Sequence, residues 1–350
     1  MKKNMIALAV AAAMIPGFAA AEGATVSGYA DITFKSTNDT SYGNSGVKNI
    51  FGAAAEINVR NTVGDVTVGA DADIGVATNN TNSSAQLEQA FFAWNAGPAT
   101  IIGGVFNNPI GLDAEDSTDM VMVSHSAVYD ALNSQTVLHG NNIAGVAAAF
   151  AAGPATITAA LLNDLQHARD DSNNDTLSVA LVANMSPMEG LDLELSHVTQ
   201  ESDGVTTGAT GDAHNYTTNK TGLDVNAGVG NVTNFNAAFT MGQVSASLDY
   251  LMPSEVVDSV YDLTLGFQAN DALGVAVRFS ETAYADKATI NGAANQDLSA
   301  HLADTSSITL QASYKIADNL KLKLEHKADE TDVAGSEDTS MTTAKFIATF

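Results

Sequence analysis

Apolar and polar residues alternate along repeated segments of about ten residues, and this pattern constrains the fold more than any other feature of the chain. From Ala24 to Lys35 the even positions are apolar or small, and most odd positions are polar. A period of two is that of a β-strand whose faces meet different surroundings. The alternation recurs at 66–76, 191–196, 261–267, 273–279, 308–316 and 320–324. We therefore predict an all-β chain.

The connections between these segments alternate in length. Short turns are expected at 61–65, 96–98, 151–154, 186–190, 242–243, 268–272 and 317–319. Longer polar links are expected at 36–47, 78–85, 107–135, 164–175, 201–231, 253–258, 284–305 and 329–340. Seven turns and eight loops separate sixteen strands, which is typical of a transmembrane antiparallel β-barrel, because lipid tolerates no unpaired strand edge. The count stays between 14 and 18, because residues 220–230 fit either a further strand or part of a loop.

One stretch competes with this interpretation. Residues 143–162 are apolar and rich in Ala, so their hydropathy fits a transmembrane helix. At their centre, Ala152-Gly153-Pro154 would break a helix and is typical of a tight turn. We therefore predict two strands here.

The N-terminal residues indicate export. Two lysines precede an apolar run over residues 5–15, and three alanines at 19–21 supply an Ala-x-Ala cleavage pattern. The apolar run is too short to cross a bilayer as a helix. Residues 1–21 are therefore expected to be a cleaved signal peptide, and residues 22–350 a single transmembrane β-barrel domain.

The chain is strongly acidic and contains no cysteine. Without the two lysines of the signal peptide, 12 Lys and Arg stand against 40 Asp and Glu, a net charge of −28. Nucleic-acid binding needs clustered cations, so we expect no nucleic-acid partner and instead expect cations or neutral solutes. Without cysteine there are neither disulfides nor thiolate metal sites, so backbone pairing and packing must hold the fold.

The chain ends on Phe346-Ile347-Ala348-Thr349-Phe350, with two aromatic residues on one face of the last expected strand. A soluble β-sandwich or β-helix adhesin would also alternate, but it gives a terminal Phe on a frayed end no packing role. The signal peptide, the alternation and this ending together resemble the trimeric general-diffusion porins of Gram-negative outer membranes. In that family the terminal aromatic strand, here carrying Phe346 and Phe350, is the recognition signal for the barrel assembly machinery.

The resemblance covers most of residues 22–350. Residues 24–31 look like the family's first strand. Residues 88–92 (Glu-Gln-Ala-Phe-Phe), 101–104 (Ile-Ile-Gly-Gly) and 107–109 (Asn-Asn-Pro) are similar to the pair of strands that leads into the family's constriction loop.

The resemblance implies that Asn107 to Gln135 is the third external loop, folded inward. This segment carries five carboxylates and no Lys or Arg, and irregular loops of such length are usually functional. Glu88 stands where the family commonly carries Arg, which predicts a narrower basic wall and a more acidic pore. The candidates for the acidic side of the constriction are Asp113, Glu115, Asp116 and Asp119.

If the apolar faces meet lipid, strand parity points most Lys and Arg residues into the lumen, because facing lipid costs them about 2–4 kcal/mol at the midplane. They fall on the first two and last four expected strands, which are neighbours once the barrel closes. The candidates for this basic wall are Arg278, Lys323, Lys345, Lys321, Lys35 and Arg60. The carboxylates expected inside are Asp31, Glu56, Asp71, Asp73, Asp192, Glu194, Asp249, Asp262 and Glu325. Because acids outnumber bases, we predict a cation-preferring pore.

No metal site and no enzyme is expected. The seven histidines show no metal-ligand spacing, and no nucleophile motif stands in a strand-to-helix context. Asp171-x-Asn173-x-Asp175 resembles the start of a calcium loop but lacks the Gly and the distant Glu that complete one. Loop-bound calcium is therefore the one cofactor that the sequence leaves open.

These observations predict a homotrimeric outer-membrane porin, in contact with membrane lipid and lipopolysaccharide, through which ions and small hydrophilic solutes diffuse passively. The alternative is a structural or adhesive outer-membrane or surface β-protein with a plugged lumen. Aromatic residues make up only 6% of the chain, and several lie on apolar faces, so a substrate-specific channel lined by stacking ladders is less favoured.

Overall fold

The structure is a computed structural model that describes residues 23–37, 49–76, 84–134, 136, 138–163, 177–199, 206–207, 225–226, 230–254, 257–285, 287–290, 293–297, 304–331 and 338–350. The expected signal peptide at 1–21 and the calcium-like stretch at 171–175 lie outside these residues.

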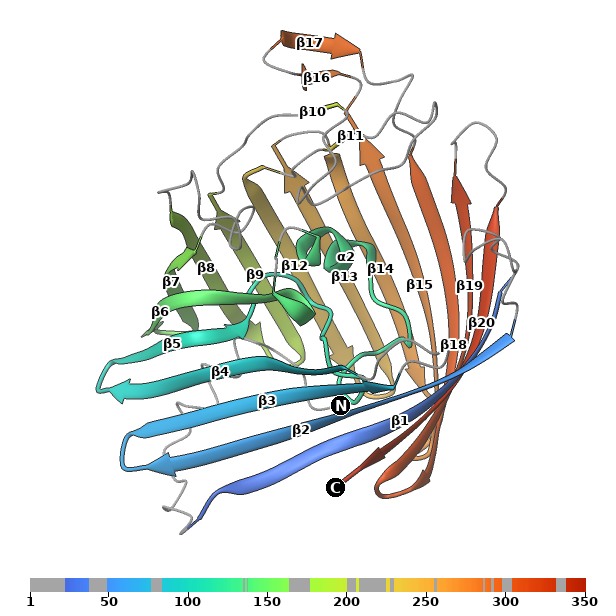
Figure 1. Cartoon of the computed structure of the whole chain (residues 1–350), viewed down its shortest axis with the longest axis horizontal. Helices are drawn as coiled ribbons and strands as arrows, with labels where there is room; N and C mark the ends of the chain where they lie inside the picture. Colours follow the sequence, from blue (N-terminus) through green and yellow to red (C-terminus); the bar gives the residue numbers. More distant parts are fainter. Residues whose placement is uncertain are drawn as a thin grey trace.

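Sixteen antiparallel strands form one closed barrel, which confirms the predicted fold (Figure 1). Each strand pairs with its neighbours in chain order, and the first strand, β1, closes the barrel against the last, β20, with Ala30 opposite Ala348. The first eight are β1 Thr25–Thr37, β2 Asn49–Val63, β3 Val66–Val76, β4 Ser84–Ala96, β5 Ala99–Asn107, β6 Asn142–Ala152, β7 Ala155–Asn163 and β8 Leu177–Met188. The second eight are β9 Leu191–Val198, β12 Val232–Met241, β13 Val244–Pro253, β14 Val257–Gln268, β15 Leu273–Tyr284, β18 Thr305–Ala317, β19 Leu320–Thr331 and β20 Thr339–Thr349.

Short turns and long connections follow the predicted order, except that the longer link predicted at 253–258 comprises only residues 254–256 and is as short as a turn. Residues 143–162 form the hairpin of β6 and β7, and Gly153 takes a φ of 65° in its turn, a conformation that glycine adopts without steric cost. The prediction of two strands here is confirmed. No helix in the described part of the chain is long and apolar enough to cross a membrane.

Two small hairpins lie outside the barrel sheet, in the long connections (Figure 1). In one of them, β10 (Thr206–Thr207) pairs with β11 (Val225–Asn226), and in the other β16 (Lys287–Ile290) pairs with β17 (Ala293–Asp297). Residues 225–226 therefore belong to a loop hairpin and not to a further barrel strand.

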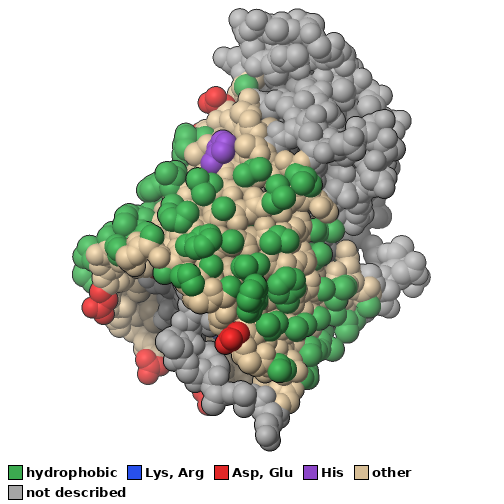
Figure 2. Space-filling view, turned by 90° about the vertical axis from the view of Figure 1, so that its left-hand side faces the viewer, with side chains coloured by type: hydrophobic (Ala, Val, Ile, Leu, Met, Phe, Trp, Pro, Cys, Tyr) green, Lys and Arg blue, Asp and Glu red, His purple; other side chains and the backbone are tan. Residues whose placement is uncertain are grey.

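The strands expose apolar side chains on the outside and turn polar ones inward. On β1, Val26 and Ile32 are 61% and 56% exposed, whereas Asp31 is only 5% exposed. Figure 2 shows one outer face, where hydrophobic side chains dominate the described strands. This arrangement suits a barrel surrounded by hydrocarbon, because lipid-facing and lumen-facing residues alternate along each strand.

The connection between β5 and β6 lies against the inner wall. It runs from residue 108 to 141 and contains helix α2 (Ala127–Asn133) and the 3-10 helix η1 (His139–Asn141), so it is longer and more ordered than the irregular segment predicted at 107–135. Helix α2 begins at Ser126, whose hydroxyl oxygen accepts a hydrogen bond from the Tyr129 N–H at 3.0 Å. We call residues 108–141 the inner segment.

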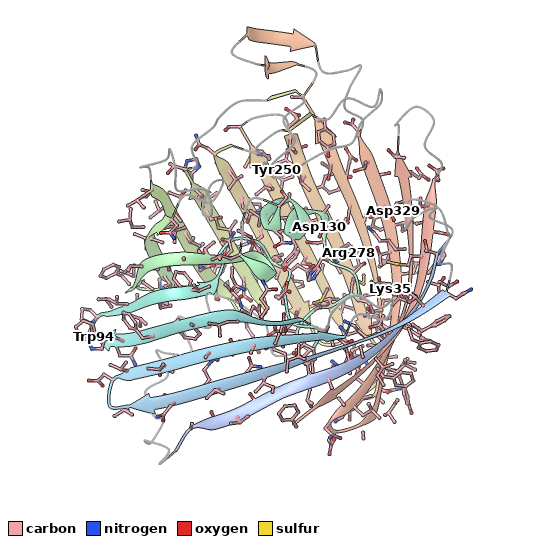
Figure 3. All side chains as sticks on the ribbon, in the orientation of Figure 1. Lys35, Trp94, Asp130, Tyr250, Arg278 and Asp329 are labelled. Atoms are coloured by element: carbon pink, nitrogen blue, oxygen red, sulfur yellow. The ribbon has the colours of Figure 1, made fainter. Side chains whose placement is uncertain are left out.

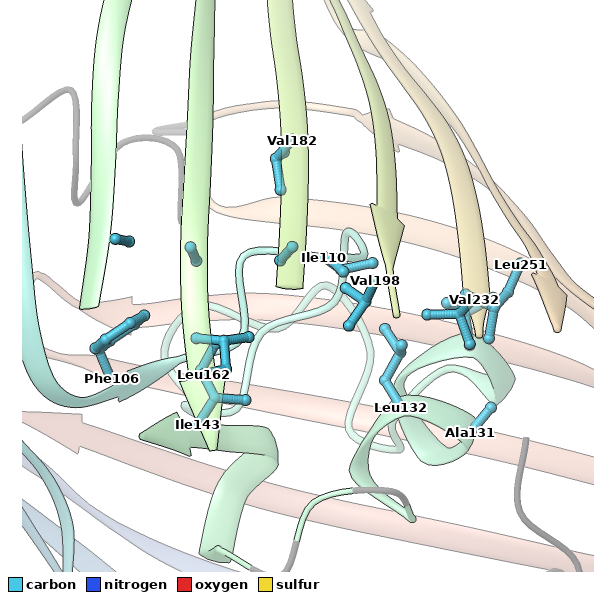
Figure 4. Close-up of a cluster of buried hydrophobic side chains, with 14 of the residues drawn as sticks. Phe106, Ile110, Ala131, Leu132, Ile143, Leu162, Val182, Val198, Val232 and Leu251 are labelled. Atoms are coloured by element: carbon cyan, nitrogen blue, oxygen red, sulfur yellow. The ribbon is translucent and has the colours of Figure 1, made fainter. Parts of the chain in front are cut away.

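An apolar cluster holds one side of this segment (Figure 4). Leu132 of α2 and Ile110 pack with wall residues that include Val198, Val232 and Leu251, all of which are fully buried. Burying each such side chain stabilises the packed state by about 1.5–3 kcal/mol. Part of the inner wall is therefore apolar, which alternation alone did not predict.

Candidate functional site

Carboxylates of the wall accept hydrogen bonds from the backbone of the inner segment. Asp262 on β14 accepts from the N–H groups of Ala127 and Val128 at 3.1 and 2.8 Å. These N–H groups belong to the first turn of α2 and have no partner within the helix, so a negative side chain stabilises them. Asp249 on β13 accepts from the Leu112 N–H at 2.8 Å.

Glu325 on β19 anchors a second part of the segment. Its two carboxylate oxygens accept from the N–H groups of Val123 and Ser124 at 2.5 and 3.0 Å. Gln311 on β18 donates to the Val121 carbonyl oxygen at 2.5 Å. The extended stretch before α2 is thus bound through its backbone to two adjacent strands.

Lys323, beside Glu325 on β19, is buried under the segment. Its ammonium group donates to the carbonyl oxygens of Ser117, Met120 and Met122 at 3.3, 2.7 and 3.2 Å. An ammonium group carries three hydrogens, so all its donors are used. Lys323 therefore positions the loop and does not face open lumen.

Arg278 on β15 has a similar place. Its guanidinium donates to the carbonyl oxygens of Ser124 and His125 at 2.9 and 2.5 Å, and it lies 3.8 Å from Asp113 and 3.9 Å from Asp262. The side chain is 3% exposed. The charge of Arg278 is thus balanced between one carboxylate of the segment and one of the wall.

Ser117 connects the inner segment to the two strands that close the barrel. Its hydroxyl donates to Asp31 on β1 at 3.1 Å and accepts from Lys345 on β20 at 2.5 Å. Lys345 and Asp31 also form an ion pair at 3.0 Å. Three predicted basic residues, Arg278, Lys323 and Lys345, are therefore gathered around the inner segment.

The other predicted basic residues lie apart from this group. Lys35 lines the cavity described below, near the long-loop rim. Arg60 pairs with Asp71 on β3, and its guanidinium carbon lies 5.0 Å from the centre of the Phe91 ring. Lys321 lies opposite Lys315 near the short turn between β18 and β19.

The predicted acidic residues of the loop face groups within the protein. Asp113 accepts from the Ser126 N–H at 2.6 Å and lies 3.7 Å from His125. Glu115 accepts from the Tyr129 hydroxyl and lies 3.9 Å from His125. The imidazole of His125 stacks on the Tyr129 ring with 3.8 Å between their centres. These residues form a network at the start of α2.

The pKa shifts in this network follow from burial and opposite charge. Burial alone would raise the pKa of Asp113, but the nearby charges of His125 and Arg278, with the hydrogen bond from the Ser126 N–H, lower it. Burial alone would lower the pKa of His125, but the nearby carboxylates of Asp113, Glu115 and Asp130 raise it. The pair therefore favours its ionised form.

Asp116 has the opposite environment. Burial raises the pKa of its carboxyl group, and a hydrogen bond to Glu56, with the negative charges of Glu56, Glu88 and Asp119, raises it further. The backbone N–H of Asp119 donates to the Asp116 carbonyl oxygen at 2.8 Å. The four predicted loop acids thus divide into a pair near His125 and a pair near strands β2 to β4.

A cavity of about 750 Å³ remains between the inner segment and the wall. Glu115, His125 and Asp130 line it from the segment, whereas Lys35 and Lys327 line it from the wall. Figure 3 shows Asp130 on α2 and Lys35 on β1, with Arg278 between them in that view. The wall also contributes the carboxylates of Asp31, Asp73, Glu325 and Asp329, so acidic and basic groups both line the cavity and the acidic ones are more numerous.

The C-terminal aromatic residues both face outward. Phe346 and Phe350 are 43% and 66% exposed. The Phe350 N–H donates to the Gly28 carbonyl oxygen at 3.1 Å, and the Gly28 N–H donates to the Phe350 carbonyl oxygen at 3.3 Å, so the chain end is held against β1.

Sequence reasoning missed two features of this region. Helix α2 was not predicted, although Ser126 before an Ala-Val-Tyr run is an N-cap signal. Strand parity did not place Glu88 inside, although the family resemblance implied a pore position; it is buried on the inner wall, where its Oε1 accepts from the Asn142 side chain at 3.1 Å. A bulge in β4, invisible in the sequence, turns it inward.

Of three comparisons with known proteins, one found matches, and these concern the fold. A scan against protein-family models and a search of curated proteins found no match. Among solved structures, a variant of Rh. blastica porin with five substitutions aligns with a TM-score of 0.57 at 13% identity, over 94% of this chain and 100% of that chain. A loop-deletion mutant of OmpT, an outer membrane protein of Vibrio cholerae, aligns with a TM-score of 0.57 at 12% identity, over 94% of this chain and 99% of that chain. At these identities, the likeness shows that this chain has the sixteen-strand barrel fold found in porins.

Proposed function

We propose that the protein is a passive channel of the Gram-negative outer membrane for ions and small hydrophilic solutes, with no catalytic step. The observation that carries the proposal is the attachment of the inner segment to the wall by Asp262, Arg278, Lys323 and Glu325, beside a polar cavity. A loop held in this way narrows the barrel without filling it. A porin and an outer-membrane protein with the same fold support this assignment.

The proposed mechanism combines sieving with electrostatics. The inner segment sets the width, and solutes pass between Glu115 and Asp130 on one side and Lys35 and Lys327 on the other. A transverse field of this kind orients polar solutes, and fixed charges in a narrow pore select ions by sign. Because inward carboxylates outnumber inward cations, we propose a preference for cations.

We further propose that the channel is a homotrimer, that membrane lipid and lipopolysaccharide surround it, and that Phe346 and Phe350 direct it to the barrel assembly machinery. The outward position of both rings supports this last role, because a recognition signal must be accessible before the barrel closes.

Planar-bilayer recordings of the purified mature protein test the proposal. We expect discrete conductance steps in groups of three, and a reversal potential of cation-selective sign in a salt gradient. An absence of conductance by protein that has folded would contradict the channel and would favour a structural protein with a plugged lumen. An anion-selective reversal potential would contradict the cation preference alone.

Neutralising Asp113, Glu115, Asp116 and Asp119 together tests the role of the loop. Replacing each by its amide should lower cation preference, measured as a smaller reversal potential in the same gradient. Asp192→Asn, on β9 away from the segment, is the control for loss of an inward carboxylate. Unchanged selectivity in the fourfold variant would place the selectivity filter elsewhere.

A further inference from the structure

Three inward carboxylates meet on neighbouring strands of the wall. Glu56 on β2 lies directly opposite Asp73 on β3 in the strand register. Glu88 comes from β4, the next strand. One carboxylate oxygen from each of the three residues lies within 4.8 Å of the others. This spacing is that of oxygens around a single bound ion.

A β-bulge brings the third carboxylate to this place. In the pairing of β3 with β4, the consecutive residues Asp71 and Ala72 lie opposite Gln89 and Leu87, so Glu88 is an extra residue on its strand. Leu87 is 64% exposed on the outer face, whereas Glu88 and Gln89 are both buried. On a regular strand Glu88 would alternate with Gln89 and face lipid. Bulges commonly re-aim one side chain in this way next to functional sites.

The cluster contains oxygens without a partner. Glu56 is 1% exposed and Glu88 is 2% exposed, and in each the Oε2 atom has no hydrogen-bond donor among the described residues. Neither side chain forms an ion pair with a Lys, Arg or His of the described chain. A buried anionic oxygen without a donor is costly, so the arrangement calls for a positive ion or a shared proton.

The inner segment adds a fourth carboxyl group. Asp116 is in hydrogen-bond contact with Glu56, and its Oδ1 atom also has no donor among the described residues. Tyr29 on β1, the neighbour of β2 on the side away from β3, lies opposite Glu56 in the strand register, and its side chain is buried. Asp116 and Tyr29 therefore both lie next to Glu56, at the edge of the group formed by the three wall carboxylates.

We propose that Glu56, Asp73, Glu88 and Asp116 bind a hard divalent cation of the calcium class. Ca²⁺ accepts six to eight oxygen ligands in flexible geometry, which suits carboxylates from separate strands, whereas Mg²⁺ demands a near-octahedral set. The ion would tie the inner segment to strands β2 to β4, a part of the wall separate from the strands β15 and β19 that hold it through Arg278 and Lys323. The inference concerns binding and does not depend on conduction.

Calorimetric titration of the refolded mature protein with CaCl₂ at pH 7 tests the site. We expect saturable binding to the unaltered protein, and at least a tenfold loss of affinity in the double variant Glu56→Gln, Glu88→Gln. Both replacements keep the side-chain shape. Glu194→Gln, an inward carboxylate on β9 bonded to Asn236, is the matched control and should bind as the unaltered protein does.

Two results would overturn the proposal. Absence of Ca²⁺ binding to the unaltered protein would mean that the carboxyl groups share a proton instead. Undiminished binding to the double variant, with its circular dichroism and melting intact, would place the ion in another part of the chain. Should the double variant fail to fold, the luminescence of Tb³⁺, excited through the adjacent Tyr29, is measured with the single variants Glu88→Gln and Tyr29→Phe. Loss of the signal in both supports the site, and retention in both overturns it.

Discussion

Two basic side chains of the wall, Lys323 and Arg278, bind backbone carbonyl groups of the inner segment and are almost excluded from solvent. Lys323 and Arg278 were predicted as pore-wall cations from strand parity, and both lie inside the barrel. Strand parity cannot predict which groups they bind, because the inner segment is more than 130 residues away in sequence. Arg278 contacts Ser124, 154 residues earlier, and Lys323 contacts Met120, 203 residues earlier. Their charges therefore act mainly on the loop.

Lys323→Met tests this at one residue. It leaves three buried carbonyl oxygens without a donor, and each unsatisfied group costs about 1–3 kcal/mol. We expect a lower denaturant midpoint in lipid vesicles and larger current fluctuations. Lys321→Met, on the same face nearer the short turn, should change neither. Equal effects of both substitutions would argue against a docking role for Lys323.

The pair of Asp113 and His125 predicts a pH window for loop docking. The lowered pKa of Asp113 gives stability that is present above its ordinary value of 3.8 and is lost as pH falls through the folded pKa. The raised pKa of His125 gives stability that is present below its ordinary value of 6.5 and is lost as pH rises through the folded pKa. Docking should thus be tightest between these ordinary values.

Amide hydrogen exchange over residues 113–130, corrected for the intrinsic pH dependence, measures that window. Protection should be greatest inside it and should fall on both sides. In Asp113→Asn the decline at high pH should shrink, because His125 loses its nearest carboxylate. The same profile in the variant and the unaltered protein would count against the pair as the titrating element.

At the scale of elements, the inner segment is held against the inside of the barrel wall through its backbone. Besides Asp249, which accepts from the Leu112 N–H, two wall carboxylates hold it near α2 through backbone N–H groups: Asp262 at the start of α2 and Glu325 just before it. Hydrogen bonds to charged groups contribute about 1.5–3 kcal/mol each. The wall thus fixes the backbone of the segment, independently of most of its side chains.

The double variant Asp262→Asn, Glu325→Gln removes both charges. We expect the segment to leave the wall part of the time, so that single-channel conductance rises and current noise increases. The control is Asp192→Asn. Asp192 lies on β9 and accepts a hydrogen bond from the Ser186 hydroxyl on the neighbouring strand β8. A quiet channel of unchanged conductance in the double variant would show that other contacts suffice.

Sequence reasoning succeeded where structure is local. The strands, their parity and the Gly153 turn follow from a period of two and from turn chemistry, which neighbouring residues determine. It failed at Glu88, because a bulge is a property of two strands in register and not of one. It also failed at α2, since a helix of seven residues depends on its buried contacts more than on its own propensity.

For the whole molecule, the outward aromatic residues at the chain end allow a test of the proposed assembly signal. Replacing Phe346 and Phe350 by Ser should lower the amount of protein assembled in outer membranes several-fold, while the channels that do assemble keep their conductance, because neither ring faces the lumen. Membrane fractionation followed by bilayer recording measures both quantities. Phe279→Ser, another outward aromatic residue, is the control. Equal losses in the control would indicate a general need for apolar surface.

The contacts of Ser117 also predict the order in which parts of the barrel fold. Its two partners, Asp31 and Lys345, belong to the first and last strands of the barrel, so their joint site forms only when β1 meets β20. Contacts between residues so distant in sequence form late, because the loop-closure entropy must be overcome first. A fluorescent probe near Ser117 should therefore report a slower refolding phase than one in the β6–β7 hairpin, because the Ser117 contact forms only when the barrel closes.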